Sequence, residues 1–520
     1  MQIVRGALQR GERRSVSHPA VRTMRHLHFA FFILHVVFIG CARPRPVTPQ
    51  PRPPQAVDPV QQLRTDIDAA LNQPGHLHGT WGVVIESLAR NDRLYERNPQ
   101  TLLVPGSTMK LVTVAVASET ATWEYTFETR LLTAGSIDDG VLKGDLVLVG
   151  GGDPSLLGRP VSDTIAPWVD ALKARGITRV TGRVIGDDDA VEEPRPGFAW
   201  SWEDMGFAYG ALPGALNFAE NVVDVTVTPG NAEGLPATIE VPPHARGLEV
   251  VNRITTTAAG TPTNLWPEIR PGDVALTIYG TIGQGAAPAV VSAAAGNPTL
   301  WVARALRNAL LEAGIDVEGE AADIDDLPVK PARDGLVLHE HRSPPLAEVA
   351  KPLLKESINL YAEAVLRLAT GPEGPRTTDP ALDAVRLRLQ AWGIPPDGIQ
   401  IVDGSGLSRR DVIAPETLVT VLRRFYDPSK QSPWMQALAV AGRDGTLERR
   451  MKGTPGEGNA LAKSGSMSNI RTLAGYVWSA DGEPLVYAVM ANNFEGSAAN
   501  VVATIDKVIV RLASFSRTPR

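Results

Sequence analysis

The order of apolar and polar positions divides this chain into two kinds of region. In residues 61–132 and 336–515, apolar residues at helical spacing alternate with short runs at strand spacing, which predicts a mixed α/β body. In residues 133–335, most segments alternate with a period of two and few have helical spacing, which predicts a β-rich insert. The body is therefore expected to form from two stretches of sequence that the insert separates.

A buried helix is predicted from Ser107 to about Ser118, because an apolar run follows the turn residues Pro105 and Gly106. Lys110 lies three residues after Ser107, and positions i and i+3 share one face of a helix. A serine hydroxyl needs an adjacent base to react near neutral pH, and a lysine kept neutral by burial can be that base. Ser-x-x-Lys motifs also occur on ordinary helix surfaces, so this pair is informative only together with other motifs.

Two further motifs follow in the second part of the body. Ser357-Ile-Asn359 lies at a break between two predicted helices, and Lys463-Ser-Gly465 lies on a predicted strand and is followed by Ser466. Each motif occurs by chance in many proteins. The three together, in this order and in these local structures, match the signature of serine penicillin-recognising enzymes.

The residue types fit the cleavage of an amide through a covalent intermediate. Ser107 would attack the carbonyl carbon while Lys110 takes the hydroxyl proton. Ser357 and Lys463 can return a proton to the leaving amine. The backbone N–H groups of Ser107 and Ser466 would hold the oxyanion, an interaction often worth about 3–4 kcal/mol per donor.

The remaining polar groups of these motifs suit substrate binding. Asn359 can hydrogen-bond the substrate amide. Lys463, with the hydroxyl groups of Ser464 and Ser466 on either side of Gly465, can bind a terminal carboxylate. Ser464 replaces a more common threonine and keeps its hydroxyl group.

The spacing of the motifs resembles one particular family. Ser107 and Ser357 are 250 residues apart, and Ser357 and Lys463 are 106 apart. A long β-rich insert between the first two motifs resembles the class C low-molecular-mass penicillin-binding proteins, which are the penicillin-binding protein 4 type D-alanyl-D-alanine carboxypeptidases/endopeptidases. The resemblance covers about 61–515 and includes four other stretches, namely Gly144–Pro154, Asn217–Val222, Asp403–Arg409 and Gly442–Leu447.

This resemblance implies an α/β (α+β) fold of the serine β-lactamase/transpeptidase-like class, with an antiparallel sheet, flanking helices and an insert of two small domains. It implies a peptidase that removes the terminal D-Ala of peptidoglycan stem peptides or cuts their cross-links. Such an enzyme would form an acyl-enzyme on Ser107, bind β-lactams such as penicillin, and use no metal or cofactor.

One segment of the insert resembles a specificity element of the same family. Trp200-Ser-Trp-Glu-Asp-Met205 matches a family segment whose acidic residue contacts the free amino end of a diaminopimelate side chain. That match makes Asp204 a candidate for substrate binding. The alternative is an aspartate that caps an aromatic-rich turn, and the sequence favours neither.

The N-terminal residues have the pattern of an export signal. Arginines precede an apolar run at Phe29–Gly40 that is too short to span a membrane comfortably, and Cys41 follows it. This pattern resembles a bacterial lipoprotein cleavage site, which would make Cys41 the lipidated residue and the membrane a partner only through that anchor. The alternative is a secretory signal cut elsewhere. Met24 is a second candidate start, and the Pro-rich residues 41–59 predict an extended tether.

Charge and cysteine content argue against a nucleic-acid partner and against an intrachain disulfide. The 520 residues carry a net charge of -6, but residues 1–40 hold six arginines and one acidic residue, so the remainder carries about -11. A nucleic-acid-binding body would show a basic patch, so nucleic acid is not an expected partner. Cys41 is the only cysteine, which excludes an intrachain disulfide.

Other chemistries find less support in the sequence. No His-Glu-x-x-His or Gly-x-Ser-x-Gly motif is present, and His339 and His341 are expected in a surface linker. Asp187–Asp189 lacks spaced partner ligands, so a solvated loop is predicted there rather than a metal site. A serine β-lactamase and a non-catalytic peptidoglycan-binding lipoprotein of the same fold remain alternatives.

Overall fold

The computed structural model describes residues 58–518 except 74–77, 157, 159–164, 194, 271–274 and 375. The predicted leader, Cys41 and nearly all of the tether lie outside the described residues. Among the helices of the described part, none combines the length and the apolar character that a membrane crossing requires.

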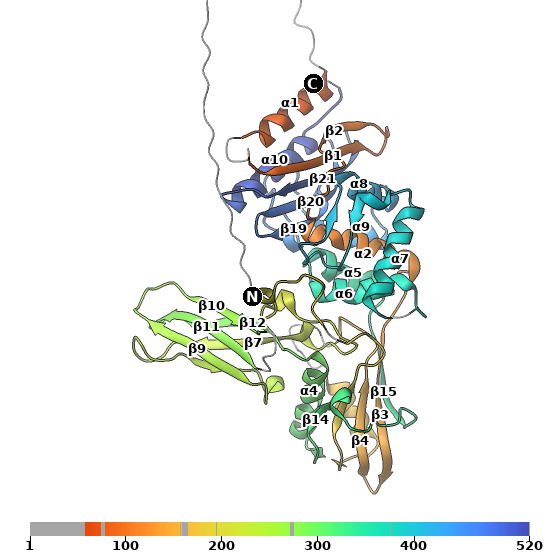
Figure 1. The fold of residues 1–520 in the computed structure, drawn as a ribbon, viewed down its shortest axis with the longest axis vertical. Helices are drawn as coiled ribbons and strands as arrows, with labels where there is room; N and C mark the ends of the chain where they lie inside the picture. Colours follow the sequence, from red (N-terminus) through yellow and green to blue (C-terminus); the bar gives the residue numbers. More distant parts are fainter. Residues whose placement is uncertain are drawn as a thin grey trace, which may run out of the picture. The chain divides into compact units, whose positions relative to one another are not determined.

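A six-stranded antiparallel sheet in the order β18-β19-β20-β21-β1-β2 forms the centre of the body (Figure 1). The first and last parts of the chain meet in it, because all eight residues of β1 pair with β21. The strands are β1 (Thr80–Ser87), β2 (Arg93–Arg97), β18 (Ala439–Val440), β19 (Leu461–Met467), β20 (Ile470–Trp478) and β21 (Pro484–Asn492).

Helices cover both faces of this sheet, because its strands are apolar on both sides. Val83 and Ile85 of β1 pack in a cluster with α1 (Pro59–Leu71) and α10 (Ala498–Ala513), whereas Val84 packs in a cluster on the opposite face. The helices of that opposite face are α2 (Met109–Thr120), α5 (Leu346–Lys355), α6 (Asn359–Leu366), α7 (Thr378–Ala391), α8 (Pro415–Arg424) and α9 (Pro433–Ala437). Helix α2 is buried along almost its whole length.

A seven-stranded sheet makes up one part of the region between the first two motifs. Its main path is β13-β5-β4-β3-β15, with β6 joined to β4 and β14 joined to β6. Helices α3 (Ala166–Ala174) and α4 (Pro298–Glu312) contribute to its apolar core. The strands are β3 (Glu128–Asp138), β4 (Val141–Val149), β5 (Arg179–Val180), β6 (Val184–Asp187), β13 (Asp316–Val317), β14 (Ala321–Asp323) and β15 (Val337–Arg342).

Two three-stranded sheets form the rest of this region, in the orders β10-β11-β9 and β12-β7-β8 (Figure 1). The first holds β9 (Val250–Thr257), β10 (Asn264–Glu268) and β11 (Leu276–Gly283), and the second holds β7 (Val222–Thr228), β8 (Thr238–Glu240) and β12 (Ala289–Ala294). A short pair, β16 (Ile399–Gln400) and β17 (Val412–Ile413), belongs to the body.

Two local expectations differ from the structure. His339 and His341 lie on strand β15, which pairs with β3, so the predicted linker is wrong at this point. Asp187 and Asp188 are buried, so the predicted solvated loop is also wrong.

Candidate active site

Ser107 and Lys110 come together at the N-terminal end of α2. Ser107 lies in the short 3₁₀ turn Gly106–Thr108, and the α-helix itself begins at Met109, two residues later than predicted. Lys110 Nζ lies 3.0 Å from Ser107 Oγ, within hydrogen-bonding distance. Gly106 has φ +52°, and a Cβ atom there would approach Ser466 N to 3.3 Å, so glycine suits both the turn and the neighbouring strand.

The Lys110 amine is completely buried and has three partners. Besides Ser107, it donates to Asn359 Oδ1 at 2.6 Å and to the Ser405 carbonyl oxygen at 2.7 Å. Burial lowers the pKa of Lys110 to about 7, although the negative charge of Asp403, and to a lesser degree of other buried carboxylates, acts in the opposite direction. Near neutral pH this amine is therefore partly unprotonated and can accept a proton.

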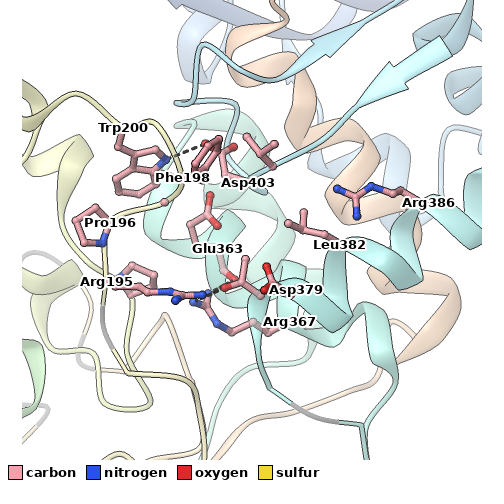
Figure 2. Close-up of a pocket in the computed structure, with 14 residues that line it drawn as sticks. Arg195, Pro196, Phe198, Trp200, Glu363, Arg367, Asp379, Leu382, Arg386 and Asp403 are labelled. Atoms are coloured by element: carbon pink, nitrogen blue, oxygen red, sulfur yellow. Dashed lines mark hydrogen bonds between the residues drawn. The ribbon is translucent and has the colours of Figure 1, made fainter. Parts of the chain in front are cut away.

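Asp403 organises the loop that carries the Ser405 carbonyl group. Its carboxylate is buried and accepts hydrogen bonds from the backbone N–H groups of Ser405, Gly406 and Ser408. It also accepts one from the Trp200 indole at 2.8 Å (Figure 2). Three of these donors belong to the loop itself, and the fourth belongs to the insert.

Glu363 adds a second buried carboxylate behind the same loop. It accepts hydrogen bonds from Gly404 N at 3.0 Å and Ser405 N at 2.8 Å. Burial, followed by the charge of Asp403, raises the pKa of Glu363 to about 7. Glu363, Asp403 and Trp200 line a cavity of about 460 Å³ (Figure 2).

The second motif lies where α5 ends and α6 begins. Asn359 is the first residue of α6, and its amide group donates to the Tyr209 carbonyl oxygen at 2.8 Å while accepting from Lys110. Ser357 has φ +67°, a left-handed conformation that is uncommon for serine. Strained backbone of this kind is frequent where a structure holds a side chain for function.

The third motif lies on β19, whose backbone approaches the turn that carries Ser107. A Cβ atom at Gly465 would lie 2.5 Å from the Pro105 carbonyl oxygen and 3.1 Å from Ser107 N, so only glycine fits this contact. The side chain of Lys463 is fully buried and donates to the Ser464 carbonyl oxygen at 2.8 Å. Burial, followed by the nearby Lys110, lowers the pKa of Lys463 well below its usual value.

A cavity of about 550 Å³ joins these elements. Of the predicted residues, those that line it are Ser107, Asp204, Ser357, Asn359, Ser464 and Ser466. Lys110, Lys463 and Gly465 do not line it. Lys110 and Lys463 instead hydrogen-bond to residues that do. The cavity is therefore a cleft to which all three motifs contribute, either directly or from behind.

The insert supplies one wall of this cleft. Asp204 ends the 3₁₀ turn Trp202–Asp204 and accepts a hydrogen bond from the Tyr209 hydroxyl at 2.9 Å. Because Tyr209 also accepts from Asn359 through its backbone, Asp204 is connected to the second motif. Both Asp204 and Tyr209 face the cavity.

Sequence reasoning missed several residues of the site. Thr446 lines the cavity and accepts from the Ser464 hydroxyl at 2.7 Å, and the exposed Arg409 also lines it. Thr446, Arg409 and Asp403 lie in two of the stretches that carried the family resemblance, which was the available signal. Glu363 had no signal in the sequence, because it appears as an ordinary polar position within a helix.

Comparison with known proteins agrees with this geometry. Residues 63–514 match the model of the D-Ala-D-Ala carboxypeptidase 3 (S13) family. A D-alanyl-D-alanine carboxypeptidase of Actinomadura sp. (strain R39) is 33% identical over 470 residues, which are 88% of this chain and 85% of that protein. The D-alanyl-D-alanine carboxypeptidase DacB of Haemophilus influenzae is 27% identical, over 79% of this chain and 85% of that protein.

A solved structure supports the same assignment. The crystal structure of penicillin-binding protein 4 from Haemophilus influenzae superimposes with a TM-score of 0.74 at 26% identity, covering 85% of this chain and 97% of that one. A complex of that protein with a β-lactam gives a TM-score of 0.68 at 25% identity, over the same shares of the two chains. The fold is therefore of the penicillin-binding, serine β-lactamase/transpeptidase-like class, as predicted. The chain belongs to the D-Ala-D-Ala carboxypeptidase 3 (S13) family.

Proposed function

We propose that this protein is a serine D-Ala-D-Ala carboxypeptidase that cleaves peptidoglycan stem peptides through an acyl-enzyme on Ser107. The observation that carries the proposal is the hydrogen bond of 3.0 Å between Lys110 Nζ and Ser107 Oγ at the edge of a cleft. The lowered pKa of the lysine supports its role as a base. The activities of the similar carboxypeptidases support the substrate class.

The first half of the reaction forms the acyl-enzyme. Neutral Lys110 takes the Ser107 proton as Oγ bonds to the carbonyl carbon between the two D-Ala residues. The backbone N–H groups of Ser107 and Ser466 stabilise the negative oxygen. The C–N bond then breaks, and the departing amine takes the proton back from Lys110 by way of the Ser357 hydroxyl.

The second half releases the shortened peptide. Water replaces the departed D-Ala and loses a proton to Lys110 as its oxygen bonds to the acyl carbon. The bond to Ser107 Oγ then breaks, and the serine regains its proton. A β-lactam would follow the first half and remain bound to Ser107.

Substrate binding is assigned to the polar walls of the cleft. Asn359 would hold the substrate amide, and the hydroxyl groups of Ser464, Ser466 and Thr446 would hold the terminal carboxylate. Such a carboxylate would favour the charged form of the Lys463 amine beneath them. Asp204, which also lines the cleft, would contact an amino group of the stem peptide.

The same cleft can serve a DD-endopeptidase, because a cross-link presents the same type of bond. We propose residues 61–132 and 336–515 as the catalytic domain and residues 133–335 as an insert of two subdomains. We further propose an exported protein of the cell envelope, in the periplasm and anchored by lipid at Cys41. Mass spectrometry of the mature N-terminus tests the anchor, and an unmodified residue other than Cys41 there would contradict it.

Release of D-Ala from a model tripeptide ending in D-Ala-D-Ala tests the enzymatic proposal. The wild type should release D-Ala, Ser107→Ala should not, and the control Ser118→Ala on the same helix should retain activity. Hydrolysis of β-lactams far faster than of peptide would instead favour a β-lactamase. Retention of muropeptides without any release of D-Ala would favour a binding protein.

A further inference from the structure

Four carboxylate side chains converge in the insert at the ends of β6 and β14. Asp188 and Asp189 follow β6, Glu193 lies a few residues further on, and Asp325 belongs to the 3₁₀ turn after β14. One oxygen atom from each carboxylate lies within 4.8 Å of the others. Convergence of this kind from separate segments brings together oxygen ligands that the linear sequence keeps apart.

Asp188 is the side chain that points to a missing partner. Asp188 is only 1% exposed, and its Oδ2 accepts a hydrogen bond from the Thr299 hydroxyl. Its Oδ1 is buried without a hydrogen-bond partner among the described residues. A buried carboxylate oxygen without a partner is costly, and a bound cation removes that cost.

Carboxylates outnumber basic side chains around this group, which also favours a bound cation. Within the described part of the chain, the ion pairs to this group come from two basic side chains. Lys330 contacts Asp189 at 2.8 Å and Asp325 at 2.6 Å, and Arg333 contacts Asp187 and Asp189. Against these two cations stand six carboxylates, those of Asp187, Asp188, Asp189, Glu193, Asp323 and Asp325.

We propose that Asp188, Asp189, Glu193 and Asp325 hold a hard divalent cation of the Ca²⁺ class. Carboxylate oxygens are the ligands that such cations prefer, and the set contains no sulfur or imidazole ligand that would favour zinc. This site is separate from the catalytic cleft, since none of its four residues lines that cavity. Its role would be to stabilise the insert.

The site also lies close in sequence to the wall of the cleft. Glu192, next to Glu193, accepts hydrogen bonds from the Thr378 backbone and hydroxyl at the start of α7. Further along, Ser201 and Asp204 line the catalytic cavity. A cation would therefore fix the segment that connects β6 to this wall, and we expect its effect mainly on stability.

Calorimetric titration of the EDTA-treated full chain with Ca²⁺ tests the proposal. The wild type should bind one equivalent, and its midpoint of thermal unfolding should rise by several degrees at saturation. Glu193→Gln, at an exposed position, and Asp188→Asn, which keeps an acceptor for Thr299, should each weaken binding on the order of tenfold or more. Asp316→Asn, an exposed carboxylate of the same sheet, is the matched control and should bind like the wild type.

A further variant sharpens the result. Lys330→Met should tighten Ca²⁺ binding, because the ammonium group contacts two of the same carboxylates. Absence of binding by the wild type, or equal binding by the wild type and both ligand variants, would overturn the proposal.

Discussion

Asp403→Asn is the most informative substitution behind the catalytic lysine. In the wild type, Oδ1 accepts from the N–H groups of Ser405 and Gly406, and Oδ2 accepts from Ser408 N and the Trp200 indole. An asparagine presents an NH₂ group at one of these two positions. With the NH₂ group at the Oδ1 position, Gly406 N loses its acceptor, whereas Ser405 N keeps Glu363 as an acceptor. With the NH₂ group at the Oδ2 position, both Ser408 N and the Trp200 indole lose their acceptor.

The magnitude follows from these lost bonds. A hydrogen bond to a charged group is worth about 1.5–3 kcal/mol, so the loss of one or two predicts a destabilisation of about 1.5–6 kcal/mol. The Ser405 carbonyl group, which accepts from Lys110, would shift with the loop. A displacement near 1 Å at a reacting group can lower a rate roughly 100-fold, which is the expected loss in acylation.

The assay is the rate of labelling by a fluorescent penicillin, measured across pH together with the midpoint of thermal unfolding. Removal of the Asp403 charge should also lower the pKa of Lys110, so the pH at which labelling reaches half its plateau should fall. Asp427→Asn is the control, because Asp427 also accepts hydrogen bonds from several groups of its own loop but is exposed. Wild-type labelling and stability in Asp403→Asn would refute the positioning role.

Three further predictions concern the cleft. Only the neutral Lys110 amine accepts a proton, so wild-type acylation should fall about tenfold per pH unit below about 7 and level off above it; a flat profile from pH 5 to 9 would contradict this. Thr446→Val should raise KM about tenfold for a peptide with a free terminal carboxylate but not for its amide, as steady-state kinetics can check. Asp204→Asn should lower kcat/KM about two- to fivefold for a peptide with a free amino side chain, and an equal loss for the acetylated peptide would rule out direct contact.

The parts of the site that depend on local geometry were predictable from the sequence. Ser107 and Lys110 are separated by three residues, so any helical turn brings them together. Asn359 and the β19 residues were recognisable because short motifs in a fixed order carry them. Even here the sequence missed the 3₁₀ turn, since the choice between two helical turns depends on packing against β19.

The parts that depend on long-range contacts were not predictable. Asp403 gains its role from four donors, and one of them, Trp200, lies 203 residues away in the chain. The residues of strand β15 were predicted to form a linker because they are mostly polar. They form a strand through pairing with β3, which the sequence does not reveal. A solvated loop was predicted at Asp188 because Asp325, whose carboxylate lies close to it in space, is far away in the sequence.

The identity of the acylated residue tests the account most directly. Purified protein is incubated with penicillin, and intact mass and peptide mapping locate the adduct in the wild type, Ser107→Ala and the control Ser118→Ala. The account predicts one penicilloyl group on Ser107 in the wild type and in Ser118→Ala, and none in Ser107→Ala. An adduct on another residue, or one that persists in Ser107→Ala, would contradict it.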